Sequence, residues 1–141
     1  MIKATLNLLA TLLLISCNKN PKNEAIQDKS SKANEELIGR SATLTFPEMK
    51  AVVHYVNDST LHWKTTDKNG IVAEGDEKMN YEKLSENLHF LNWIEKDGWT
   101  VSQVIDSKKG TVKAFWSFAD ETSLRGKRRS LFVDGTFAFA K

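Results

Sequence analysis

From residue 37 onward the chain consists of short runs in which apolar and polar residues alternate, and this pattern constrains the fold more than any other feature. Connections such as NDS, DKNG, KDG and SKKG separate the runs and are typical of hairpin turns. No segment keeps a 3.6-residue apolar period over three turns, and the best helical candidate, residues 76–87, is polar and equally compatible with a strand. The predicted strands span residues 41–46, 50–56, 60–66, 70–85, 88–96, 100–106, 111–119 and 129–140.

This series of strands predicts an all-β fold. Antiparallel strands joined in chain order favour an up-and-down barrel, because closure of the sheet removes its exposed edges. A barrel of eight strands leaves room for side chains or for one small ligand. A sandwich of two sheets is the alternative arrangement.

The composition indicates one ordinary globular domain. The chain has 141 residues, 27% of them charged, with a formal net charge of +2. Because a nucleic-acid surface needs a concentrated basic face, this balance predicts no nucleic-acid partner. We interpret the basic run at residues 125–129 as solvated loop charges; a surface for anionic lipid headgroups or polyanionic envelope material is the alternative.

Metal and cofactor chemistry has no recognisable motif in the sequence. His54, His62 and His89 fall on three different predicted strands, without HxH or HExxH spacing. Gly-rich phosphate loops, GxSxG elbows and paired cysteines are absent from the sequence. We therefore predict no metal and no cofactor.

The N-terminus has the pattern of a bacterial lipoprotein signal. Lys3 precedes an apolar run at residues 8–15, which is too short for a transmembrane helix, and LISC then ends at Cys17, the only cysteine. We predict a signal peptide at residues 1–16, lipidation of Cys17 and a flexible tether over residues 17–36, ahead of a barrel domain at 37–141. The expected location is the cell envelope, on the periplasmic side or at the outer membrane.

Glu95 is the most informative carboxylate. On the predicted strand 88–96, alternation places His89, Leu91, Trp93 and Glu95 on one face. Alternation alone leaves open whether this face points into the barrel.

A family resemblance addresses that question. The block LHFLNWIEKDGWTVSQVID, followed by GTVKAFWSF and FVDGTF, resembles the MoaF-like family of calycin-type barrels, which are related to phenolic acid decarboxylases and, more distantly, to lipocalins. Its most specific part is W-x-E-x-x-G-x-x-V, present as Trp93, Glu95, Gly98 and Val101. The resemblance implies a calycin-like barrel over residues 39–139, with Trp93 and Glu95 facing the lumen.

The enzymatic part of the resemblance is incomplete. In phenolic acid decarboxylases the glutamate acts with an arginine and a pair of tyrosines, whereas the arginine position here falls on Lys64 and the segment ATLTFPEM has no tyrosine. Lysine keeps the charge but lacks the bidentate fork of arginine. Glu95 and Lys64 therefore remain only candidates for catalysis.

We expect a membrane-tethered lipoprotein whose barrel binds a small, partly apolar ligand through Trp93, Glu95, Leu91, His89 and Lys64. The alternatives are a decarboxylase-like enzyme that uses Glu95 as acid or base, and an envelope interaction or inhibitor protein. Because residues 111–119 carry apolar residues on both faces, a homodimer through this strand is a further prediction.

Overall fold

Each alternating run of the sequence forms a β-strand in the computed structural model, which describes residues 36–141. Eight antiparallel strands close into a barrel in chain order, which confirms the predicted fold class and excludes the sandwich. Residues 76–87, the helical candidate, lie mostly in a strand and its following turn. The strands are β1 (Ser41–Thr45), β2 (Met49–Asn57), β3 (Thr60–Asp67), β4 (Val72–Lys83), β5 (Leu88–Ile94), β6 (Thr100–Asp106), β7 (Thr111–Ala119) and β8 (Arg128–Phe139).

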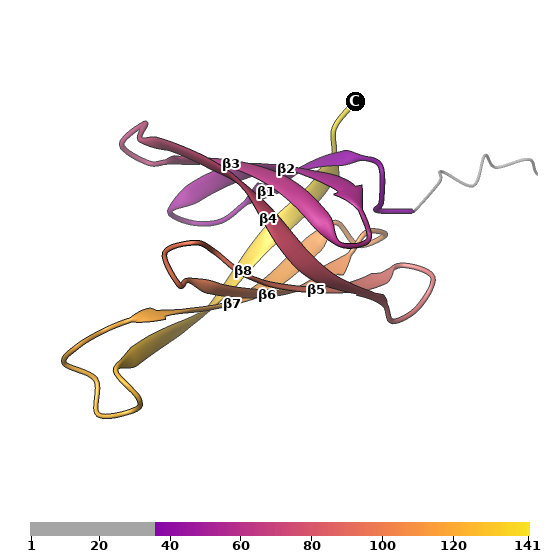
Figure 1. Ribbon diagram of the computed structural model, residues 1–141. Coiled ribbons are helices and arrows are strands. Elements are labelled where there is room, and N and C mark those ends of the chain that lie inside the picture. Colours follow the sequence, from indigo (N-terminus) through magenta and orange to yellow (C-terminus); the bar gives the residue numbers. More distant parts are fainter. Residues whose placement is uncertain (1–35) are drawn as a thin grey trace, which may run out of the picture. The chain divides into compact units, whose positions relative to one another are not determined.

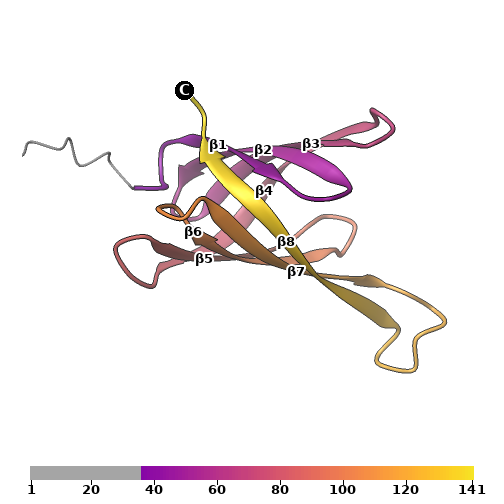
Figure 2. The same ribbon diagram turned by 180° about the vertical axis from the view of Figure 1, so that it is seen from behind.

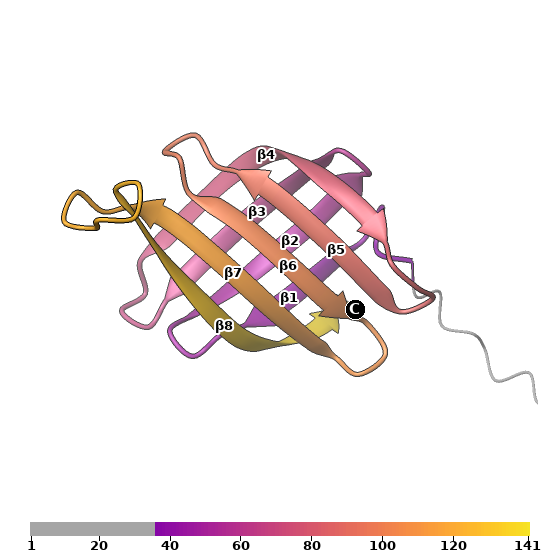
Figure 3. The same ribbon diagram turned by 90° about the horizontal axis from the view of Figure 1, so that it is seen from below.

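The pairing of β1 with β8 closes the barrel. Thr45 lies opposite Thr136 and Leu44 opposite Phe137, so the first and last strands hydrogen-bond to each other. Figures 1 and 2 show β1–β4 on one side of the barrel and β5–β8 on the other, and Figure 3 shows the strands crossing one another between the two sides. Because every strand has two hydrogen-bonded neighbours, the closed sheet of the described residues has no edge strand.

The up-and-down topology sorts the connections to two ends. The β1–β2, β3–β4, β5–β6 and β7–β8 loops lie at one end, which we call the cavity end, and the β7–β8 hairpin projects furthest beyond it (Figure 1). The β2–β3, β4–β5 and β6–β7 turns lie at the other end, called the packed end.

Alternation along each strand divides side chains between the interior and the surface. The interior towards the packed end is filled by large side chains that are at most 1% exposed: Leu37, Tyr55, Leu61, Leu91, Ile105 and Val112. Such filling is the normal close packing of a small barrel. It leaves the cavity end as the part of the lumen where a ligand has room.

The predicted signal peptide, Cys17 and nearly all of the predicted tether lie outside the described residues. Within residues 36–141, no helix is long and apolar enough to cross a membrane.

Candidate functional site

A cavity of about 390 Å³ lies in the lumen at the cavity end of the barrel. This volume falls within the usual range of small-molecule sites, roughly 300–1,000 Å³. All four tryptophans of the chain line it, although they come from β3, β5, the β5–β6 turn and β7. The lining residues are Phe46, Met49, Ala51, Val53, Trp63, Thr65, Ala73, Trp93, Glu95, Asp97, Trp99, Val101, Gln103 and Trp116.

Glu95 is held at the cavity by the turn that follows β5. Its backbone N–H donates to the carbonyl of Trp99 at 2.7 Å, and the Gly98 N–H donates to the Glu95 carbonyl at 2.8 Å. Gly98 has a φ of 88°, a conformation that favours glycine. Because the turn is tight, Glu95 keeps the inward parity of Trp93, two residues before it.

The carboxyl group of Glu95 contacts the indole of Trp93. Trp93 Nε1 donates a hydrogen bond to Glu95 Oε1 at 3.2 Å. Burial is the main influence on the pKa of Glu95 and raises it; the bond from Trp93 opposes this, and the negative charges of Asp97 and Glu77 raise the pKa further. The site therefore disfavours an unaccompanied negative charge at Glu95.

Aromatic side chains build the other walls. Phe46 packs edge-on against Trp116, with ring centroids 5.2 Å apart, and Trp99 stacks on Phe118 at 4.4 Å. The indole of Trp63 lies against Gly75, where an added Cβ would come within 3.2 Å of the ring. The absence of a side chain at this position therefore permits the close approach of the Trp63 indole to β4.

Two polar atoms in the cavity wall are buried without a hydrogen-bond partner among residues 36–141. They are Gln103 Oε1, on the inner face of β6, and Trp63 Nε1. The Gln103 side chain is only 5% exposed, so bulk water does not satisfy it. An unpaired buried acceptor costs free energy, which a ligand with a matching donor would recover.

Arg128 anchors the β5–β6 turn, which contributes Asp97 and Trp99 to the cavity lining. Its Nη2 donates to the carbonyls of Gly98 (3.0 Å) and Ser117 (2.8 Å), and its Nε donates to Ser117 Oγ (3.0 Å). The interpretation of residues 125–129 as solvated charges is thus wrong for Arg128, because its guanidinium joins the β5–β6 turn to β7. Nothing local in the sequence indicates a partner 30 residues away.

The structure brings together only part of the predicted ligand-binding set. Trp93 and Glu95 line the cavity, whereas Leu91 and His89 lie deeper on the same inner face, both fully buried. His89 Nδ1 lies 3.0 Å from the hydroxyl of Tyr81.

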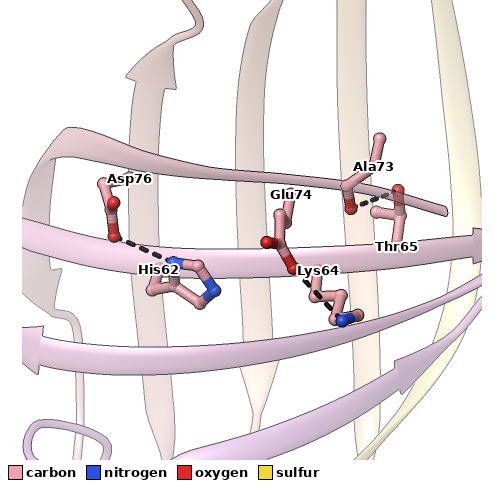
Figure 4. A network of polar contacts seen from close by, with 6 residues as sticks. All are labelled: His62, Lys64, Thr65, Ala73, Glu74 and Asp76. Carbon is pink, nitrogen blue, oxygen red and sulfur yellow. Dashed lines mark hydrogen bonds and ion pairs between the residues drawn. The ribbon is translucent and has the colours of Figure 1, made fainter.

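The expectation that Lys64 lies in the lumen is wrong. Its neighbours Trp63 and Thr65 line the cavity, so alternation turns Lys64 to the outside of β3. There its Nζ lies 3.2 Å from Glu74 Oε2, in a row of surface contacts along β3 and β4 (Figure 4). Lys64 is therefore not a partner for Glu95.

Sequence reasoning also missed Trp63, Trp99 and Gln103 as site residues. Alternation would have placed Trp63 and Gln103 on the lumen side once the inward face of each strand was known. Trp99 lies in a turn, where no such rule applies. Two of the three histidines lie outside the lumen: His62 contacts Asp76 at 2.8 Å and His54 contacts Ser41 at 3.0 Å.

Comparison with known proteins assigns the chain to a family. No curated protein sequence was found to match the chain. Fourteen chains of solved structures are similar. One, from Burkholderia vietnamiensis and described as a "putative beta-lactamase", has a TM-score of 0.62 and 18% identity, covering 74% of this chain and 95% of its own, and so shares the fold. The model of the MoaF-like family matches residues 38–129. With most of its barrel matched by that model, the chain belongs to the MoaF-like family.

Proposed function

We propose that the barrel is a binding protein for a small, partly apolar molecule, which enters the lumen at the cavity end. The cavity of about 390 Å³, lined by all four tryptophans, is the observation that carries this proposal. Protein interiors are normally filled to crystal-like density, and the packed end of this barrel follows that rule. Mostly aromatic walls with a few polar groups are the usual construction of a ligand site.

Binding fits the site better than the two alternatives. A decarboxylase-like enzyme needs a cationic group to hold the substrate carboxylate, yet none of the described residues that line the cavity is Lys, Arg or His. An inhibitor or interaction protein of this fold has no need of an internal space, and a lumen filled by side chains would have supported that role. The cavity supports small-molecule binding instead.

Native mass spectrometry of the full chain, purified from its own host, tests the proposal. We expect an adduct of constant mass on the wild type. Thr65→Phe should abolish the adduct, because the new ring enters the cavity, whereas Thr66→Phe on the outer face of the same strand should retain it. An adduct that persists in Thr65→Phe, or a wild type with no adduct and no response to added ligands, would contradict binding in the lumen.

We also propose that the barrel is tethered to a membrane of the bacterial envelope through a lipid on Cys17. The support is the sequence LISC after a short apolar run, followed by a polar segment suited to a spacer. The mature wild-type protein should begin at Cys17, carry acyl chains by mass spectrometry and fractionate with membranes. A Cys17→Ser protein should lose all three properties. Soluble, unacylated wild-type protein would exclude the anchor.

A further inference from the structure

We propose that the cavity selects ligands with a positively charged nitrogen, such as a quaternary ammonium group on an apolar body, over neutral or carboxylate ligands of similar shape. This inference rests on the proposed binding function and specifies its ligand class. Three independent properties of the cavity support it: its charge, its aromatic walls and an unsatisfied acceptor.

The two charged side chains that line the cavity are both acidic. Glu95 and Asp97 line the cavity, and none of the described lining residues is basic. Glu77 lies on the inner side of β4, only 8% exposed, and its charge acts on Glu95. A carboxylate ligand would be repelled by these acidic groups, and beside the half-buried Glu95 that repulsion is stronger than in water. A cation would instead offset the cost of keeping Glu95 charged.

The aromatic walls suit the same ligand. Trp63, Trp93, Trp99 and Trp116 all face the cavity. The faces of aromatic rings attract cations, tryptophan most strongly, and rings that surround a desolvated quaternary ammonium group are a common recognition device. Apolar walls alone would also hold a neutral ligand, so the tryptophans support the proposal only together with the carboxylates.

Gln103 provides an acceptor that has no protein partner. Its Oε1 is buried in the cavity wall and makes no hydrogen bond among the described residues. A carbonyl oxygen attracts an ammonium N–H or the polarised C–H groups of a quaternary ammonium, whereas a carboxylate has nothing to donate to it. In Glu95, the hydrogen bond from Trp93 Nε1 reaches only Oε1, so the second carboxylate oxygen, Oε2, takes no part in that bond.

Isothermal titration calorimetry of the full chain tests this charge preference with three probes of similar size: benzyltrimethylammonium, benzyl alcohol and phenylacetate. At pH 7 and low salt we expect the cation to bind at least about tenfold more tightly than the alcohol, with phenylacetate weakest. Glu95→Gln should remove most of the cation's advantage and leave the affinity for the alcohol unchanged. Glu74→Gln, which removes an exposed carboxylate on the outer face of β4, is the matched control and should behave like the wild type.

A second measurement uses the wild type alone and so does not depend on the folding of a variant. Benzyltrimethylammonium carries its charge at every pH, so a change of its affinity with pH reports on the protein. Between pH 7 and about pH 4 its affinity should fall as Glu95, whose pKa is raised by burial, takes up a proton, while that of benzyl alcohol stays constant.

The outcomes separate the two proposals. Equal affinities for cation and alcohol, or tighter binding of phenylacetate, would overturn the charge preference and leave the binding function standing. A cation preference that survives in Glu95→Gln and is independent of pH would also overturn it. Failure of all three probes to bind at millimolar concentration, with no change in tryptophan fluorescence, would contradict both proposals.

Discussion

Gly135, on the inner face of β8, is expected to control how closely β1 and β8 approach each other. A Cβ added there would lie 2.7 Å from the carbonyl oxygen of Thr45 and 2.7 Å from Cδ1 of Phe46. Both contacts are much shorter than normal van der Waals distances, and the Thr45 oxygen belongs to the backbone of the strand that closes the barrel. Gly135→Ala therefore requires β1 to move.

The size of the effect follows from two opposing contributions. Overpacking of a filled interior costs about 1–3 kcal/mol. Gly135 does not have a positive φ, so alanine also restricts the unfolded chain and returns about 0.4–1 kcal/mol. We expect a net loss of about 1–2 kcal/mol in the free energy of unfolding. For a domain of about 105 residues, an unfolding entropy of roughly 2 cal/mol/K per residue converts this loss to a decrease in Tm of about 5–10 °C.

Thermal unfolding followed by circular dichroism measures this change. Thr136→Ala is the control, because Thr136 is the next residue on β8 and its side chain is exposed; we expect a change of less than about 1 kcal/mol. A Tm for Gly135→Ala equal to or above that of the wild type would refute the steric argument. It would mean that the entropy contribution outweighs the contact and that β1 adjusts at little cost.

Four further predictions concern pH, buried polar groups and the outer surface. Because its folded-state pKa is raised, Glu95 contributes stability that is full below its unfolded pKa of about 4.3 and is lost as pH rises through the folded pKa. Ligand-free Glu95→Gln should thus melt above the wild type at pH 7 but not at pH 3, and equal curves at pH 7 would exclude a burial cost. Tyr55→Phe removes a buried hydroxyl that has no hydrogen-bond partner among residues 36–141, so urea titration should show unchanged stability or a gain of up to ~1 kcal/mol, and a clear loss would reveal a partner. Arg128→Lys loses the guanidinium that bonds to the carbonyls of Gly98 and Ser117. Urea titration should show a loss of about 1–3 kcal/mol in the free energy of unfolding, with faster hydrogen exchange in the β5–β6 turn. Wild-type values of both would show that these hydrogen bonds are dispensable. The homodimer stays a prediction: Phe132 is 86% exposed and packs against Phe115 on the outer face, so sedimentation should show a dimer that Phe132→Ser dissociates, and a wild-type monomer at high concentration would exclude it.

The secondary structure and the order of the strands could be predicted because they depend on local chemistry. Alternation gives the strands and the Gly, Asn and Asp residues give the hairpins, so that each strand pairs with the next along the chain. The placement of Trp93 beside Glu95 is also local, since the two residues are separated by one residue on an extended segment. Their inward direction was implied by the family resemblance rather than by the alternation.

One error concerns the direction of a side chain on its own strand, and the other concerns a contact with distant segments. The family resemblance places Lys64 in the lumen, at the position of a family arginine, but the alternation of β3 about Trp63 turns it outward to Glu74. Arg128 lies in a basic run that resembles many solvated loops, yet its partners come from a turn and a strand elsewhere in the chain. In both cases the type of side chain predicts its surroundings less well than the position of its strand in the barrel does.

By itself, the amino-acid sequence determined that this chain forms antiparallel hairpins able to close into a barrel, because turn chemistry and a two-residue period act between near neighbours. Only the tertiary structure decided which part of the barrel interior is filled by side chains and which part remains a cavity. Closure of β1 on β8 sets the lumen's width, and it gathers four tryptophans, Glu95 and Gln103 from separate strands and a turn around one space. The volume of that space depends on how all of these side chains pack together, a long-range property that no single strand carries.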